Sequence, residues 1–216
     1  MDSAAYIRKL LERGEHAPEQ FRAALLAVPP LDRDAWVDRV LGLGALPEDG
    51  AELPSGGVPY LPCPVDALLR VVDLAQIKAS DVFVDVGSGV GRSAALVSLL
   101  TGAPSIGLEI QSGLVRAMRE LAARLPGLRL HCVQGDAAEL ARTMTVGSVF
   151  FLYCPFSGER LTRVLADLEE IARTRSIRVC CVDLARLDCP WLELEREAEG
   201  GVAIYKSRLR VPGSGS

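Results

Sequence analysis

The chain has 216 residues, 49% of them hydrophobic, so it is long enough to bury one sizeable core and too apolar for a disordered protein. Its formal charge of -4 supplies no overall basic field, which argues against nucleic acid as a partner. No apolar run approaches the about 20 residues of a membrane span, and the first residues lack a signal-peptide pattern, so we expect a cytoplasmic protein without membrane association.

The N-terminal part of the chain is predicted to be helical. Residues 3–42 carry apolar side chains at spacings of three and four, interrupted by proline and glycine, which predicts two or three short helices. Asp32 or Asp34 is expected to cap the last of them. Residues 47–64 are rich in proline and glycine and are expected to form a loop. We therefore assign 1–57 to a helical cap and loop that shapes a substrate pocket. Its apolar stripe could instead form a dimer surface, so monomer and homodimer both remain open.

Strand and helix patterns alternate over the rest of the chain. Short apolar runs that end in turn residues predict buried parallel strands, at 82–86, 105–109, 128–134, 148–153 and 177–184. Helices are expected before and between these strands, at 65–77, 91–100, up to residue 124, at 137–142 and at 158–174. Such alternation is typical of a doubly wound α/β sheet with right-handed crossovers.

The pattern changes at the end of the chain. Residues 192–197 and 202–206 alternate at period two around Gly200-Gly201, which predicts an antiparallel β-hairpin. The expected fold class is therefore α/β, with a doubly wound, Rossmann-like seven-stranded sheet that ends in this hairpin. The sheet and its helices are assigned to 58–211, and a flexible tail to 212–216.

Cysteine and histidine give no sign of a metal site. None of the six cysteines forms a C-x-x-C pair, and the two histidines are His16 and His131, so no zinc-binding spacing is present. We expect reduced thiols and no metal. His131 falls in the middle of a strand, where a structural role is favoured over that of a base.

A glycine-rich segment, Asp85–Gly91, follows the first parallel strand and precedes a helix. An open α/β sheet binds its ligand at this place, and glycines let the backbone approach that ligand closely. A dinucleotide site would need a third glycine where Arg92 stands. Asp85 would repel a diphosphate but suits a cationic group, so the segment favours a cofactor with an aminoacyl end.

Acidic residues also follow the next two strands. Glu109 can accept hydrogen bonds from both ribose hydroxyls, and Asp136 can bind an adenine amino group. The alternative is that the glycines form only a turn and the acids only cap helices. The candidate cofactor-binding residues from this pattern are Asp85, Gly87, Ser88, Gly89, Gly91, Glu109, Asp136 and Ala137.

On these motifs, residues 58–206 resemble the class I S-adenosylmethionine (SAM) dependent methyltransferase superfamily. Three segments resemble, more narrowly, small bacterial relatives of the non-SET (Dot-type) histone lysine methyltransferases, namely Val58–Pro64, Phe83–Gly91 and Phe151–Phe156. Cys63 and Cys154 stand where these relatives usually carry Thr or Ser and Asn. The resemblance implies SAM as the cofactor and Tyr60 as a lid contact over it.

The end of the fourth strand would then lie beside the transferred methyl group. We expect Tyr153, Cys154 and Phe156 to orient the acceptor, with Tyr153 also touching the cofactor, and Asp183 is a candidate general base. The acceptor is expected to be a small molecule or a protein side chain, with a nitrogen or oxygen nucleophile. Two alternatives remain, a SAM-binding protein without transfer activity and an NAD(P)-dependent oxidoreductase.

Overall fold

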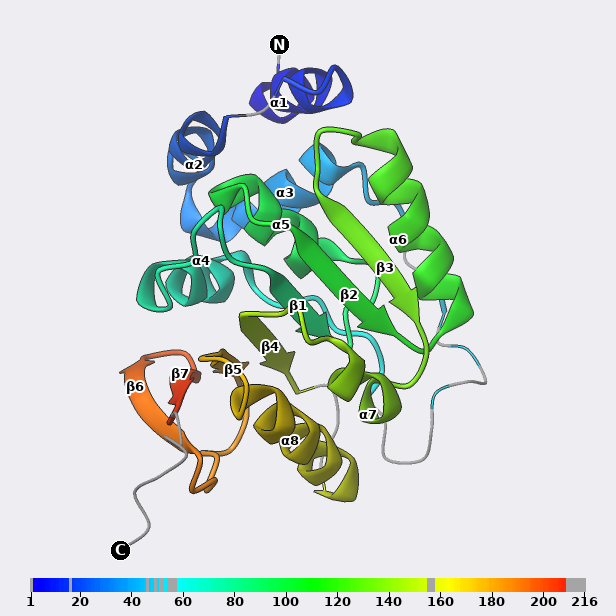
Figure 1. The fold of residues 1–216 in the computed structure, drawn as a ribbon. Helices are drawn as coiled ribbons and strands as arrows, with labels where there is room; N and C mark the ends of the chain where they lie inside the picture. Colours follow the sequence, from blue (N-terminus) through cyan, green and yellow to red (C-terminus); the bar gives the residue numbers. More distant parts are fainter. Residues whose placement is uncertain are drawn as a thin grey trace, which may run out of the picture.

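A computed structural model describes residues 2–15, 17–45, 47, 48, 50, 53, 58–154 and 158–208 (Figure 1). His16, Phe156 and the expected tail at 212–216 lie outside the described residues. Within these ranges, no helix is both long and apolar enough to cross a membrane.

The described residues form a seven-stranded sheet with the order β3-β2-β1-β4-β5-β7-β6. Its strands are β1 (Phe83–Val86), β2 (Ser105–Glu109), β3 (Leu130–Gln134), β4 (Val149–Tyr153), β5 (Arg178–Val182), β6 (Leu192–Ala198) and β7 (Val202–Ser207). The first five pair in parallel, and β7 pairs antiparallel with both β5 and β6. The expected fold class is confirmed, including the terminal hairpin, whose turn contains Gly200 and Gly201 at positive φ.

Helices cover both faces of this sheet (Figure 1). They are α1 (Ser3–Glu12), α2 (Pro18–Leu26), α3 (Arg33–Leu41), α4 (Val65–Leu74), α5 (Arg92–Thr101), α6 (Ser112–Arg124), α7 (Ala137–Leu140) and α8 (Gly158–Ala172), with the 3-10 turns η1 (Pro30–Asp32) and η2 (Ala141–Thr143). Side chains alternate between the two faces along each strand, so Phe83 packs on one core and Val84 on the other. The first core holds α1–α6, and the second holds α7 and α8.

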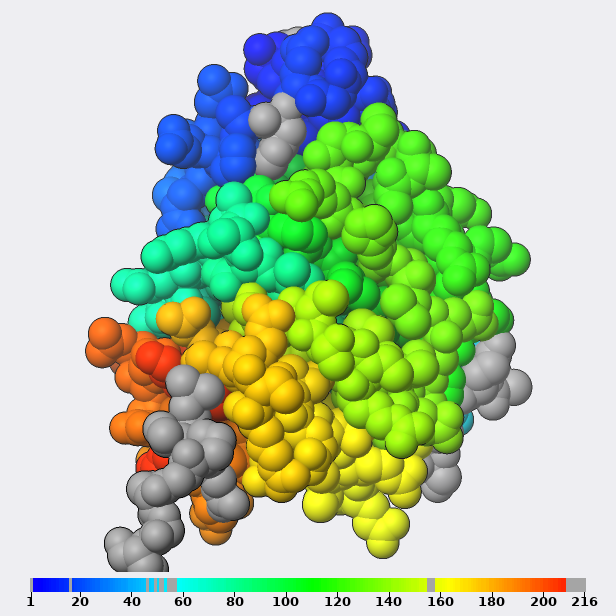
Figure 2. All heavy atoms as spheres, in the orientation of Figure 1, coloured from blue at the N-terminus to red at the C-terminus, as the bar shows by residue number. Residues whose placement is uncertain are grey.

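The N-terminal helices belong to the first of these cores. Trp36 of α3 is buried, its ring lies 5.8 Å from that of Phe21, and its indole N–H donates to Ser3 Oγ at 2.9 Å. The apolar stripe of this region therefore packs within the chain. In Figure 2 the blue spheres of α1 and α2 form one end of the molecule, opposite the end formed by α8.

The expected aspartate cap of α3 is wrong. Asp32 occupies the N-cap position but its side chain makes no capping hydrogen bond. Asp34 lies in the first turn of α3, and its carboxylate accepts the Val65 N–H at the start of α4 instead. The same carboxylate also accepts a hydrogen bond from the buried guanidinium of Arg92, described below. This charged partner binds the carboxylate more strongly than a neutral backbone N–H of α3 would.

Candidate functional site

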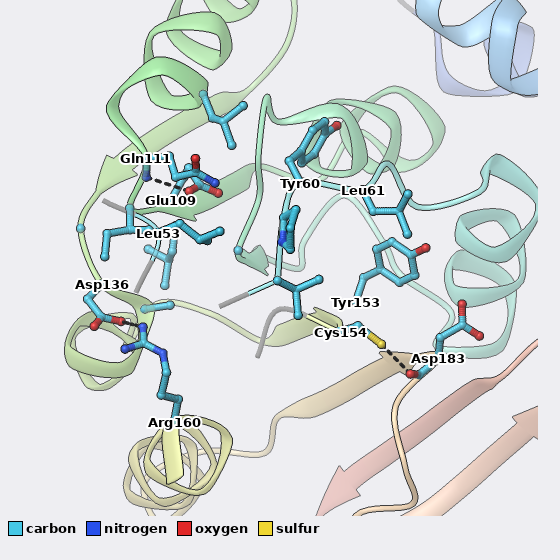
Figure 3. Close-up of a pocket in the computed structure, with 18 residues that line it drawn as sticks. Leu53, Tyr60, Leu61, Glu109, Gln111, Asp136, Tyr153, Cys154, Arg160 and Asp183 are labelled. Atoms are coloured by element: carbon cyan, nitrogen blue, oxygen red, sulfur yellow. Dashed lines mark hydrogen bonds and ion pairs between the residues drawn. The ribbon is translucent and has the colours of Figure 1, made fainter. Parts of the chain in front are cut away.

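A pocket of about 190 Å³ lies at the carboxyl ends of the parallel strands (Figure 3). Residues from five strand ends and from the segment before α4 line it. The predicted site residues among them are Tyr60, Gly87, Glu109, Asp136, Ala137, Tyr153, Cys154 and Asp183. Side chains far apart in the sequence therefore meet in one cavity, because parallel strands present their carboxyl ends at one edge of the sheet.

The glycine loop between β1 and α5 lines the pocket through Gly87, whereas the predicted residues Asp85, Ser88, Gly89 and Gly91 are not among its lining residues. Gly87, Gly89 and Gly91 all have positive φ, of 83°, 56° and 80°, which side chains other than glycine adopt with strain. The N–H groups of Gly87 and Ser88 donate to the Leu108 carbonyl of β2 at 3.0 and 2.9 Å. A Cβ atom on Gly89 would collide with the ring of Tyr60, so that ring lies directly against the backbone of the loop.

Asp85 lies behind the loop and is only 3% exposed. Among the described residues, its Oδ2 atom has no hydrogen-bond partner, although a buried carboxylate oxygen normally has one. Burial first, and then the nearby charge of Glu109, raise the pKa of Asp85 to about 7. An unsatisfied carboxylate of this kind is a fitting partner for a cationic ligand group, which would restore its charge.

The raised pKa predicts how stability depends on pH. The pKa of Asp85 in the folded protein, about 7, exceeds its ordinary value of 3.8, so folding favours the protonated carboxyl. This contribution is fully present below pH 3.8 and is lost as the pH rises through about 7. Compared with Asp85→Asn, the unfolding free energy of the ligand-free protein should fall by up to about 1.4 kcal/mol per pH unit in that window.

Urea unfolding of both proteins across this pH range measures the effect. The difference in unfolding free energy between the two proteins should change with pH below about 7 and level off above it. A difference that stays constant throughout would show that folding does not raise the pKa of Asp85.

Glu109 connects the end of β2 to the glycine loop. Its Oε2 accepts the Gly89 N–H and its Oε1 accepts the Gln111 N–H, both at 2.8 Å, and the residue is 7% exposed. The carboxylate thus fixes the loop and the start of α6 at the same time. Glu109 also lines the pocket, and a carboxylate is a suitable acceptor for ligand hydroxyls.

Asp136 both caps a helix and faces the pocket. Its Oδ1 accepts the Ala138 N–H of α7 at 2.9 Å and also forms an ion pair with Arg160 of α8. Figure 3 shows Arg160 reaching across the lower end of the pocket to Asp136. The sequence analysis did not find Arg160. Its position in the first turn of the helix after β4 is the signal that was available, because helix starts in such sheets face the ligand crevice.

The opposite end of the pocket is formed where β4 and β5 end side by side. Tyr153 pairs with Val182, so Cys154 and Asp183 are the next residues on the two strands. Both have positive φ, 39° and 51°, and the Cys154 thiol donates to the Asp183 carbonyl. Strained non-glycine residues of this kind gather at functional sites. Phe156 lies outside the described residues.

Cys154 is poorly suited to act as a nucleophile. Its pKa is raised by burial and by the charge of Asp183, which disfavours the reactive thiolate. His131 is exposed on β3 and does not line the pocket, so it gives no base there. In the described part of the chain, no group of three or more His, Cys, Asp or Glu side chains is arranged to hold a metal ion.

Comparisons with known proteins agree with this architecture. A search of solved structures finds an RNA methyltransferase from Salinibacter ruber in complex with S-adenosyl-L-homocysteine (23% identity, TM-score 0.51, covering 71% of this chain and 97% of that one). It also finds the putative methyltransferase yhhF from Escherichia coli (18% identity, TM-score 0.54, covering 76% and 91%). A third is the precorrin-6y C5,15-methyltransferase from Geobacter metallireducens (13% identity, TM-score 0.51, covering 76% and 100%). The chain has a methyltransferase fold.

The comparison with family models matches a shorter part of the chain than the solved structures do. A family model described as histone methylation protein DOT1 matches residues 62–126, from the segment before α4 to the end of α6. The match contains the glycine loop and Glu109 and stops before β3. No curated protein matches the sequence. The solved structures thus resemble about three quarters of the chain, whereas the similarity in sequence is limited to the part of the fold around the loop.

Proposed function

We propose that this protein is a SAM-dependent methyltransferase whose acceptor is a small molecule or a protein side chain. The observation that carries the proposal is the buried carboxylate of Asp85, with its unsatisfied Oδ2, behind a glycine loop against which the ring of Tyr60 packs at Gly89. SAM combines a cationic aminoacyl end with a ribose and an adenine. Two of the acids that line the pocket, Glu109 and Asp136, follow the neighbouring strands β2 and β3, which suits such a ligand.

Each part of the cofactor has a partner in this arrangement. Asp85 and the loop would hold the aminoacyl end, Glu109 would accept the ribose hydroxyls, and Asp136 with Ala137 would bind the adenine. Tyr60 would cover the cofactor from the side of the loop. Bound in this way, SAM would supply an activated methyl group for in-line transfer. The protein's task is then to align the acceptor and exclude water, which supplies most of the catalysis in such a displacement.

The acceptor would enter at the end formed by Tyr153, Cys154 and Asp183. The rim there is apolar, since Val58 and Leu61 are exposed by 44% and 62% and both line the pocket. Asp183 is the acid at this end of the cavity, opposite Asp136 and Arg160 (Figure 3). Its carboxylate can accept a hydrogen bond or a proton from a nitrogen or oxygen nucleophile as that atom attacks.

The DOT1 match supports a protein side chain as one acceptor class. It includes the glycine loop and the end of the Val58–Pro64 segment, but Phe151–Phe156, the third resembling segment, lies beyond it. The formal charge of -4 and the acids of the pocket argue against nucleic acid as the acceptor.

Calorimetric titration of the chain with SAM, S-adenosylhomocysteine and NADH, each in a separate experiment, tests the proposal. We expect micromolar binding of the first two ligands and none of the third. Binding of NADH alone would replace the proposal with a nucleotide-dependent oxidoreductase. Binding of SAM without release of S-adenosylhomocysteine in the presence of any acceptor tested would favour a binding protein without transfer activity.

Asp183→Asn should separate cofactor binding from methyl transfer. The amide keeps the size of the side chain and removes the charge that would accept the acceptor's proton, so the transfer rate should fall at least about tenfold. SAM affinity should change less than about twofold, because Asp183 follows β5, two strands away from the glycine loop after β1, and lies opposite Asp136, where the adenine would bind. The measurements are the initial rate of S-adenosylhomocysteine formation and the SAM dissociation constant.

Asp188→Asn is the matched control for this variant. Asp188 is an exposed aspartate five positions later that does not line the pocket, so its substitution should leave both quantities unchanged. An unchanged transfer rate in Asp183→Asn would remove this residue from the acceptor site.

A further inference from the structure

The guanidinium of Arg92, the first residue of α5, lies buried directly after the glycine loop. Its side chain is only 3% exposed, and all three of its nitrogens donate hydrogen bonds. Nε donates to Asp38 at 2.6 Å, one terminal nitrogen donates to Asp34 at 2.8 Å, and the other donates to the Cys63 carbonyl at 2.7 Å. The cofactor role assigned to the loop does not by itself account for these contacts.

Both carboxylates come from α3, which together with α1 and α2 forms the N-terminal extension. A buried guanidinium without paired charge would be strongly destabilising, so α3 is what allows Arg92 to stay buried. Asp34 is also held in place from the other side, because it accepts the Val65 N–H of α4 at 3.1 Å. The extension, the start of α4 and the start of α5 are therefore joined at this arginine.

The third contact reaches the segment that carries Tyr60. Cys63 lies three residues after Tyr60, and Pro62 and Pro64 flank it, so the backbone between them has little freedom. Fixing the Cys63 carbonyl therefore restricts where Tyr60 can lie. The ring of Tyr60 rests against Gly89, only three residues before Arg92 in the chain. The Arg92 side chain thus connects the start of α5, directly after the glycine loop, to the segment that places Tyr60 on that loop.

We propose that Arg92 is a positioning residue that holds Tyr60 over the glycine loop, and that the N-terminal extension thereby forms a working part of the cofactor site. This inference rests on the proposed function, since it assumes that the loop and Tyr60 bind SAM. It assigns to Asp34 and Asp38, which do not line the pocket, a role in cofactor affinity.

A double-mutant cycle tests the inference by calorimetric titration with SAM. Arg92→Met and Tyr60→Ala should each weaken SAM binding about tenfold, and the double variant should bind about as weakly as either one, because Arg92 acts through Tyr60. Arg22→Met is the matched control. Arg22 of α2 pairs with Asp73 of α4 at 2.7 Å, so it also joins the extension to the core, but far from the loop, and its loss should leave SAM affinity unchanged.

A second variant covers the case in which Arg92→Met does not fold. Asp38→Ala removes one partner of a guanidinium that Asp34 still neutralises, and it should weaken SAM binding about threefold in the wild-type background and not at all in Tyr60→Ala. Hydrogen exchange of residues 58–64 in the ligand-free protein should be faster in Arg92→Met or Asp38→Ala and unchanged in Arg22→Met.

The outcomes separate this inference from the proposed function. If wild-type protein does not bind SAM, the proposed function fails and the inference fails with it. If wild-type protein binds SAM but Arg92→Met and Asp38→Ala bind it equally well, only the inference is overturned. Effects of Arg92→Met and Tyr60→Ala that multiply in the double variant would also overturn it, because they would show that the two residues act independently.

Discussion

Gly89→Val is expected to weaken SAM binding at least about a hundredfold, which corresponds to about 2.8 kcal/mol. A Cβ atom at this position would occupy the space of the Tyr60 ring, and the φ of 56° is one that a β-branched residue adopts only with strain. The displaced Tyr60 ring could then no longer cover the cofactor in the proposed way. Calorimetric titration with SAM measures the loss.

Gly44→Val provides the matched control for that substitution. A Cβ atom on Gly44 would meet no other atom of the described residues within 4 Å, and its φ is not positive, so the same chemical change should leave SAM affinity and the melting temperature nearly unchanged. Wild-type affinity in Gly89→Val would mean that the ligand does not approach this loop. In that case the pocket would serve some other compound.

Glu109→Ala is expected to affect both stability and binding. It leaves the buried N–H groups of Gly89 and Gln111 without their acceptor, and each such loss costs about 1–3 kcal/mol, so the unfolding free energy should fall by at least about 2 kcal/mol. SAM affinity should fall about 10- to 150-fold, since hydrogen bonds from the ribose to a charged acceptor are lost as well.

Glu109→Gln separates these two effects. The amide keeps one carbonyl oxygen for a backbone N–H, so it should recover part of the stability but little of the SAM affinity. Glu139→Ala, at an exposed position on α7, controls for the loss of a negative charge and should change neither quantity. Unfolding in urea and titration with SAM would be measured on all three proteins. Full SAM affinity in Glu109→Gln would exclude a ribose contact at this residue.

Local patterns in the sequence predicted most of the fold. The strand at 105–109 was predicted with its observed bounds, and the remaining strands were predicted within two residues of theirs. Strands and amphipathic helices are recognisable locally because the spacing of apolar residues along the sequence follows their periods of 2 and 3.6 residues. The helix predicted over 65–77 ends instead at Leu74, since Gln76 adopts a positive φ of 50° that a helix does not continue through.

The candidate site was predicted where its residues follow strands. Glu109, Asp136 and Tyr153 come at or directly after a strand end, and the rule that such ends share one edge of the sheet brought them together correctly. Helix capping and cofactor binding were considered as alternatives for these acids. Asp136 shows that one residue can both cap a helix and line the pocket, because it does both at α7.

The sequence by itself determined the α/β class, the terminal hairpin and the edge of the sheet where a ligand would bind, because all three follow from local periodicity and glycine placement. Only the tertiary structure decided the partners of Arg92 and Arg160. Arg92 meets Asp34 and Asp38 across more than fifty residues, and Arg160 meets Asp136 across twenty-four. No local pattern encodes such pairs, since an arginine's partner depends on which elements pack together and on how deeply its charge is buried.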